Sequence, residues 1–400
     1  MGKLVSRYGL SPAKAVGRTR RLVRLLADNG CSPTLAAPGL VVETYSTFMR
    51  ELTEAGVELA VHSFDHVDFR GLTAEKSQYQ LKRAAQAFGK AGVEFKGFRC
   101  PYLSFSHEMV GYVPAGLFSY SSNDAIWWDI GLDETVEDRH ATVFTHLSHF
   151  YEGERAEDGL VLPRFVGDLV EIPVSLPDDL QLLDGLEQGA EGVAAAWLAL
   201  LRQSHERGAV FTVLMHPESF DACADAYAQL LAEAHSYRPP VWITRLSDIA
   251  DWWHERRAFA ARIDGGSIVL DCSARATVLQ RQGSDGGYVA VQERALPVTD
   301  VLPFVGVAAD VPEAWMETLR QRGYGFLRGD GAERCAVQLR AVDLHALRTD
   351  RQLVSHIESQ PGPLLRFAEW PDGAQSALCI TGDLDALSLR DYARRASAFR

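Results

Sequence analysis

Apolar runs of strand length alternate with helical patterns over the first 255 residues. Compact apolar runs at 57–63 and 209–217 are typical of buried strands, and 97–101, 117–122 and 169–174 predict further strands. Segments between them carry apolar residues at helical spacing. Thr73, for example, is a predicted N-cap for a helix that reaches about Ala91. Strands that alternate with helices of about 10–20 residues predict an α/β fold with a parallel sheet or barrel.

The pattern changes after about residue 256. Short strand-like runs are then separated by Gly, Asp and Ser turns, and 309–325 is typical of a helix with Gly near its end. From about 370 the alternation of an apolar strand with a polar turn and a helix returns. We therefore expect one domain from 1–255 together with 365–400, and a small α+β domain of unknown role at 256–364.

Composition narrows the class of protein. The 400 residues include 40 Lys and Arg against 53 Asp and Glu, a formal net charge of −13, and 47% are hydrophobic. The apolar content suffices for a sizeable core, whereas the acidic balance argues against nucleic acid or an anionic membrane as the main partner. Six cysteines without a CxxC pair give neither a zinc knuckle nor a disulfide framework. With no signal peptide or membrane-spanning run in view, we expect a soluble cytoplasmic protein.

Two histidines follow the predicted strand at 57–61. His62 and His66 lie four residues apart, in the segment HSFDH, and can face one metal ion from a strand end. Strand carboxyl ends are where parallel α/β folds assemble functional groups. Ordinary polar or core histidines explain the same pair about as well.

Three further segments offer chemistry at strand ends. Arg99 and Tyr102 lie in FRCPY, where the Arg can hold a carboxylate and the backbone beside Pro can face a developing oxyanion. His216 ends the very apolar run VLMH and is either a core histidine or a general acid/base. Asp383 and Asp385, in TGDLD, can serve as a base and a metal ligand, or only as a helix-capping turn.

Taken together, these four segments resemble the motifs of the polysaccharide deacetylases, the family-four carbohydrate esterases. The stretch GDLVEIPVSLPDD also resembles peptidoglycan-deacetylase-like members with a D-x-D motif. The resemblance implies a distorted (β/α) barrel of seven or eight strands. In that family the Asp-bearing strand comes first in the chain, whereas here it comes last. We therefore hypothesise a circular permutation, in which 376–385 completes the barrel; a second, truncated domain or exchange with a neighbouring chain is the alternative.

The resemblance also implies a mechanism, metal-dependent hydrolysis of the linear amide bond of an N-acetylated sugar. His62, His66 and Asp385 would bind a divalent metal, zinc being the first choice. Asp383 would be the base and Arg99 its partner, with the Tyr102 backbone at the oxyanion and His216 as the acid. The expected substrate-binding residues are Leu214 for the acetyl methyl, Trp127 or Trp128 for the sugar, and Asp124 to orient His216 or Arg99.

The substrate is expected to be a small molecule or an oligosaccharide, and homo-oligomerisation is left open. Two other functions fit the same motifs. One is hydrolysis of a different C–N bond, such as that of a cyclic amide or ureide. The other is carbohydrate binding without catalysis by a protein of the same fold. Metal content and acetate release distinguish the three.

Overall fold

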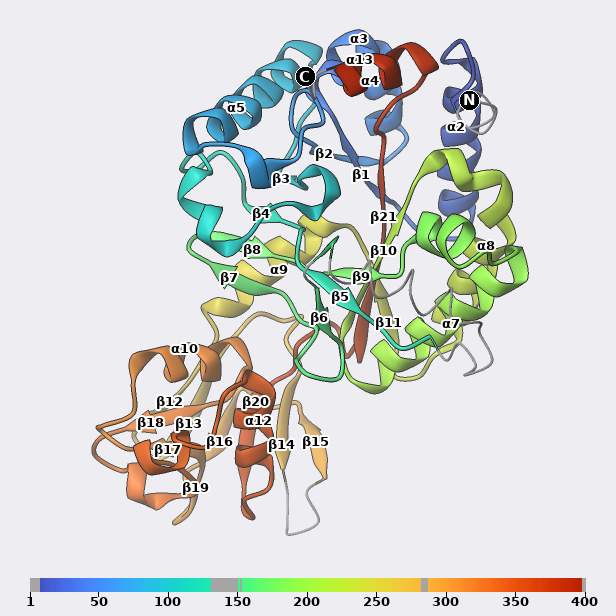
Figure 1. Ribbon diagram of the computed structural model, residues 1–400. Helices are drawn as coiled ribbons and strands as arrows, with labels where there is room; N and C mark the ends of the chain where they lie inside the picture. The colour runs from blue at the N-terminus through green and yellow to red at the C-terminus, as the bar shows by residue number, and fades with distance from the viewer. Residues whose placement is uncertain (1–7, 131–149, 152, 282–286, 398–400) are drawn as a thin grey trace. The chain divides into compact units, whose positions relative to one another are not determined.

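The computed structural model describes residues 8–130, 150–151, 153–281 and 287–397 (Figure 1). The chain forms two compact units. The first consists of Met1–Glu157, Val161–Ala250 and Ser376–Arg400, and the second of Asp158–Leu160 and Asp251–Gln375. No helix in the described ranges is long and apolar enough to cross a bilayer.

A curled, largely parallel sheet forms the centre of the first unit. Five of its strands are neighbours in the order β10-β21-β1-β2-β3. Most of their residues are fully buried, which explains why each reads as a continuous apolar run. Their bounds are β1 Thr34–Ala37, β2 Glu58–Val61, β3 Gly97–Phe98, β10 Val210–Met215 and β21 Ser376–Asp383.

Two bent segments connect β3 with β10, the two outer strands of these five. One consists of β4 (Tyr120–Ser121) and β5 (Ala125–Trp127), and the other of β8 (Leu169–Glu171) and β9 (Val174–Leu176). The strand β4 pairs with β3 and β8, β5 pairs with β9, and β9 pairs with β10. Each bent segment therefore acts as one barrel strand, and the seven strands make a ring. This confirms the predicted distorted barrel.

Three short strands extend the sheet to twelve strands within the described residues. The strand β11 pairs with β21, β6 pairs with β5, and β7 pairs antiparallel with β8. Their bounds are β6 Glu154–Arg155, β7 Arg164–Val166 and β11 Val241–Ile243.

The C-terminal strand β21 lies inside the sheet of its own chain. It pairs in parallel with β1, where Thr34 faces Thr381, and with β10, where Val210 faces Ala377. All eight of its residues are buried. The structure thus has the arrangement that a permuted barrel requires, with the strand inside the barrel of its own chain. The permutation as a relation to the family stays a hypothesis.

Helices pack around the ring, and their ends follow local sequence signals. The Thr73 side chain accepts a hydrogen bond from the Lys76 N–H at the start of α5, and Gly92, at φ 69°, ends that helix. Two helices that meet at Tyr45 precede Gly56. The bounds are α2 Ala13–Asp28, α3 Gly39–Thr44, α4 Ser46–Glu54, α5 Ala74–Ala91, α7 Ala190–Glu206, α8 Phe220–Ser236, α9 Leu246–Arg257 and α13 Leu389–Ser397.

The second unit contains three three-stranded sheets and short helices. The sheets have the orders β12-β13-β16, β15-β14-β20 and β18-β17-β19. Its two apolar clusters are built around Val305 and Phe304 of β17, so that strand joins the two cores. The bounds are β12 Ala260–Asp264, β13 Ser267–Asp271, β14 Val278–Arg281, β15 Tyr288–Val291, β16 Ala295–Pro297, β17 Leu302–Val307, α10 Glu313–Gln321, β18 Phe326–Arg328, β19 Cys335–Leu339, α11 Ala341–Leu344, α12 Asp350–Glu358 and β20 Leu364–Phe367.

Candidate active site

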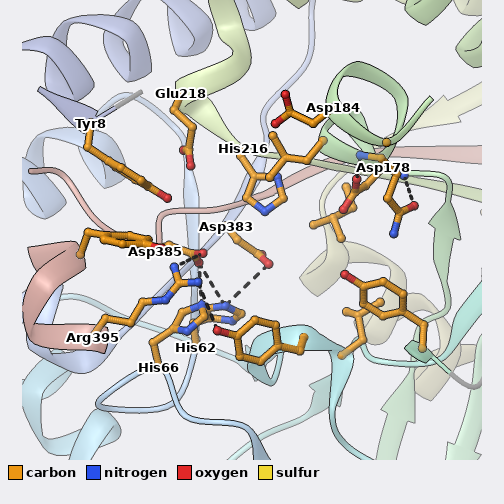
Figure 2. Close-up of a pocket in the computed structure, with 18 residues that line it drawn as sticks. Tyr8, His62, His66, Asp178, Asp184, His216, Glu218, Asp383, Asp385 and Arg395 are labelled. Carbon is orange, nitrogen blue, oxygen red and sulfur yellow. Dashed lines mark hydrogen bonds and ion pairs between the residues drawn. The ribbon is translucent and has the colours of Figure 1, made fainter. Parts of the chain in front are cut away.

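A cavity of about 480 Å³ opens at the carboxyl ends of the barrel strands (Figure 2). Its lining comes from β10, from the segments that follow β2, β3, β9, β10 and β21, from helix α13, and from Tyr8 and Tyr151. Parallel strands place their carboxyl ends on one side of a barrel, which is why motifs far apart in the sequence meet there.

Two histidines and an aspartate face one another at the bottom of the cavity. Nε2 of His66 lies 3.0 Å from Oδ1 of Asp385, and Nε2 of His62 lies 3.4 Å from the same oxygen. Both imidazoles are almost completely buried. One potential ligand atom from each of the three residues falls within 4.8 Å of the others.

The loop after β2 fixes the two histidines. The His62 N–H donates to the Ala37 carbonyl across the sheet, 3.1 Å away. The Gln80 side chain of α5 accepts the N–H groups of Phe64 and Asp65, each at 3.0 Å. Within this loop His66 has a φ of 57°, in the left-handed region, as does Ser63. Such backbone strain persists only where surrounding contacts over-determine the loop.

These three residues fit a divalent metal. Nδ1 of His62 lies 2.8 Å from the Arg99 carbonyl, and the tautomer that donates this bond leaves Nε2 as a lone-pair donor. Oδ1 of Asp385 is buried and accepts no hydrogen bond within the described residues. Burial acts to raise the pKa of Asp385, but the charges of His66 and Arg395 outweigh burial and hold it well below its usual range. Burial lowers the pKa of His66, which favours the neutral, ligating form.

Asp383 lies beside this group and is held by Arg99. Nη1 of Arg99 is 3.2 Å from Oδ1 of Asp383, and its Nη2 donates to Oγ1 of Thr381 at 2.9 Å. Arg99 is only 2% exposed, and its Nε donates to the Ser122 carbonyl at 3.1 Å. The guanidinium is therefore fixed and always charged, and it orients the Asp383 carboxylate.

Tyr102 and Leu214 both line the cavity, as the sequence predicts. Tyr102 has a φ of 61° and Leu103 a φ of 51°, so the chain turns sharply after Pro101. The Cys100 N–H donates to the Asn123 side chain at 2.7 Å, which ties this turn to the neighbouring bent segment.

His216 is oriented by Asp179, a residue that the sequence analysis did not assign. Nδ1 of His216 lies 2.8 Å from Oδ1 of Asp179, and the His216 N–H donates to Oδ2 at 2.8 Å. Burial acts to lower the pKa of His216, but the charge and hydrogen bond of Asp179 outweigh burial and raise it well above its usual value. The ring points into the cavity, as Figure 2 shows. This arrangement suits a proton donor.

The expectation for Asp124 was wrong. Its carboxylate binds His107 at 3.1 Å and Arg164 at 2.6 Å, not His216 or Arg99. The reason is the course of the bent segment, which places Asp124 between β4 and β5, where η3 (His107–Tyr112) and β7 supply the cations.

The two tryptophans expected to face a sugar were also misassigned. Trp127 packs in an apolar cluster with Leu176 and Leu214, and Trp128 donates to Oγ of Ser175 at 3.2 Å. Neither is among the residues that line the cavity, because the segment that carries them runs through the interior. The aromatic lining comes instead from tyrosines, namely Tyr8, Tyr102, Tyr151 and Tyr392.

A second group of potential ligands does not suit a metal. Asp178, Asp179 and His216 lie within ligand distance of one another. However, both oxygens of Asp179 are engaged by His216 and Ser219, and Oδ1 of Asp178 accepts the Gln181 N–H at 2.6 Å. With these atoms engaged, the group is a hydrogen-bond network around His216.

Three residues of the site were missed by sequence reasoning: Glu218 and Arg395, which line the cavity, and Asp179, which lies behind His216. Asp179 lies in the LPDDL stretch already noted for its resemblance, and Glu218 comes two residues after His216, so both had a weak signal. Arg395 is one of several arginines in a polar helix, and no spacing rule singles it out.

Comparison with known proteins agrees with the motif assignment. Residues 11–114 match the family model for polysaccharide deacetylase, which confirms the resemblance seen in the sequence. That segment contains His62, His66, Arg99 and Tyr102 but neither His216 nor the aspartates of β21. No curated protein matches the chain.

Several solved structures are similar over part of the chain. A protein described as a polysaccharide deacetylase from Mycobacterium smegmatis is 23% identical, with a TM-score of 0.48, over 60% of this chain and 77% of that one. A family 4 carbohydrate esterase from Streptomyces lividans, solved with acetate, is 20% identical over 54% and 82%, with a TM-score of 0.32. The PuuE allantoinase is 17% identical over 59% and 72%, with a TM-score of 0.43.

Proposed function

We propose that this protein is a metal-dependent hydrolase that removes the N-acetyl group of an N-acetylated sugar. One observation carries the proposal: a potential three-ligand metal group, an Arg-paired aspartate and an Asp-paired histidine face one cavity. The match of residues 11–114 to the polysaccharide deacetylase family supports the choice of bond.

His62, His66 and Asp385 would hold the metal, zinc being our first choice for a His/His/Asp set with open positions. When bound, a divalent metal lowers the pKa of a water molecule and polarises the acyl carbonyl. The remaining chemistry belongs to side chains of this chain. Asp383 accepts the proton of the attacking water, and Arg99 holds its carboxylate in place.

His216 then supplies a proton to the departing nitrogen. An amide nitrogen is a poor leaving group unless it is protonated, and the raised pKa of His216 keeps its ring charged at neutral pH. Asp179 holds Nδ1, so the other ring nitrogen is free to face the substrate. The Tyr102 backbone N–H would meet the developing oxyanion, which is supported by the position of Tyr102 in the cavity lining.

The cavity volume and the apolar Leu214 suit an acetyl methyl and one sugar ring, which favours a small molecule or a chain end as substrate. We propose a cytoplasmic N-acetyl sugar derivative as the natural substrate class.

Two variants test the assignment. Chelator-treated protein is reloaded with zinc, metal binding is measured by calorimetry, and acetate release is measured across N-acetylglucosamine, its oligomers and other N-acetyl sugars. We expect H66A to lose both zinc binding and turnover. We expect D383N to bind zinc but to lose about 10²- to 10⁴-fold in rate, since it lacks the base.

The control is E191Q, a change at an exposed position in the first turn of α7. It should match the wild type in both measurements. Acetate release by H66A or D383N at the wild-type rate would refute the assigned roles. No acetate from any sugar with zinc-loaded wild type would instead favour another C–N bond or a binding protein.

A further inference from the structure

Glu218 lines the cavity as a partly exposed residue, and the mechanism above does not use it. It lies in the short helical turn η5 (Pro217–Ser219), directly after His216. Its side chain points toward the centre of the cavity, beside His216 and opposite Asp383 (Figure 2). Its Oε1 is shielded from solvent and has no hydrogen-bond partner within the described residues.

An unpaired buried acceptor is costly for the folded protein, so its presence at a ligand cavity calls for a donor from the ligand. Burial raises the pKa of Glu218, while the charge of His216 acts to lower it. Within the cavity, Tyr8 is hydrogen-bonded to the Glu218 side chain and is itself only 3% exposed. Tyr8 thus holds the Glu218 carboxylate, while its Oε1 has no donor among the described residues.

The position of Glu218 indicates which part of a substrate it would meet. His216, two residues earlier, is the group that protonates the leaving nitrogen under the proposed function. A carboxylate beside it therefore meets the amine half of the substrate and not the acyl half, which Leu214 contacts. On an amino sugar, the nearest donors to the nitrogen are the hydroxyl groups on the two adjoining carbons.

We propose that Glu218 is a specificity-determining residue, which accepts a hydrogen bond from a hydroxyl group next to the acetamido carbon and so selects vicinal amino alcohols over simple amides. This inference rests on the proposed function. The inference adds the substrate class, because the pocket would bind a hydroxyl group of the sugar as well as its acetamido group. A site built to pair such a group rejects analogues that lack it, because the carboxylate is then left unpaired.

The test compares substrates within one protein preparation, so that the active fraction cancels. Zinc-loaded wild type, E218A, E218Q and the control E191Q are assayed for acetate release from N-acetylglucosamine and from its 1-deoxy and 3-deoxy analogues. In the wild type and in E191Q, removal of one of the two hydroxyls should lower kcat/KM by about 10- to 100-fold, mainly through KM. In E218A the same removal should change kcat/KM less than about 3-fold, and E218Q should lie between them.

A second readout separates this role from metal binding. Zinc affinity of E218A, measured by calorimetry, should equal that of the wild type. Weaker zinc binding would make Glu218 a metal ligand, and an equal loss on all three substrates would make it catalytic or structural; either result overturns the inference. Equal wild-type rates with both deoxy analogues would overturn it as well. If wild type releases no acetate from N-acetylglucosamine, the failure lies with the proposed function.

Discussion

Arg395 of helix α13 donates a 2.6 Å hydrogen bond to Oδ2 of Asp385, whose other oxygen faces the two histidines. The same guanidinium reaches the Tyr102 hydroxyl at 3.2 Å. Asp385 is therefore held on one side by an arginine and offers its free oxygen on the other. Groups that orient a ligating carboxylate in this way contribute to metal affinity.

Removal of this arginine should weaken the metal site. We expect R395A to lower zinc affinity by about 10- to 100-fold, because Asp385 loses the partner that fixes its free oxygen. R395K should lose less, since an ammonium group can still meet one oxygen. Titration calorimetry with zinc measures both. R394A, at an exposed position on the same helix, is the control. Tighter zinc binding by R395A would show that the arginine competes with the metal.

The pH dependence of turnover should report the Asp179–His216 pair. The raised pKa of His216 means that the wild type keeps its proton donor below that pKa and loses rate as the pH rises through it. D179N removes the negative charge that raises the pKa of His216 against the effect of burial. The basic limb of the kcat–pH profile should therefore move down by at least one pH unit. Rates between pH 5 and 9 measure the shift. D124N, whose carboxylate binds His107 instead, should leave the limb in place. An equal loss of kcat at every pH would show that Asp179 positions the His216 ring but does not set its pKa.

Gly39 should tolerate no larger residue, although its backbone is not strained. A Cβ there would lie 2.6 Å from the Phe64 ring and 2.8 Å from Cα of Ala84. We expect G39A to lower the free energy of unfolding by about 1–3 kcal/mol and to weaken zinc binding, because Phe64 belongs to the histidine loop. Urea unfolding and calorimetry measure the two effects.

The matched control for Gly39 is Gly89 in helix α5, where a Cβ would meet no described atom within 4 Å. G89A should stabilise the protein by about 0.5–1 kcal/mol, because Ala is the better helix former. Equal stability of G39A and G89A would contradict the close packing of α3 on α5.

Glu171 should make stability depend on pH. Burial, and then the charge of Asp124, raise the pKa of Glu171 to about 7. This folded-state pKa exceeds that of the unfolded chain. The contribution of Glu171 to the free energy of unfolding is therefore largest below about pH 4.5 and is lost as the pH rises through 7. The free energy of unfolding of E171Q, relative to that of the wild type, should therefore increase by about 2–3 kcal/mol from pH 5 to pH 8. Urea unfolding measures this difference. A difference that does not change with pH would refute the raised pKa.

The sequence predicted those parts of the site that lie within one short motif. His62 and His66 share a strand end, and Asp383 and Asp385 share another, so each pair has a local signal. Apolar runs likewise predicted β2, β10 and β21. The partnership of Arg99 with Asp383 spans 284 positions and came from the family resemblance, since no local pattern encodes it.

The site features that the sequence did not predict depend on the course of the backbone in three dimensions. Asp124 and Asp179 are both acidic residues near bends, and only the course of the two bent segments decides which of them meets His216. Trp127 and Trp128 are amphipathic side chains that suit either a sugar or a core, and the burial of their segment decides for the core.

The central place of β21 has a consequence for synthesis. During translation β1 and β10 leave the ribosome long before the strand that separates them, and until then the site lacks Asp383 and Asp385. Both strands meanwhile expose edges that can pair with other chains. The barrel therefore closes after translation has passed residue 385, when the intervening second unit is already made. We therefore expect the edges of β1 and β10 to remain open to pairing with other chains until β21 has been made.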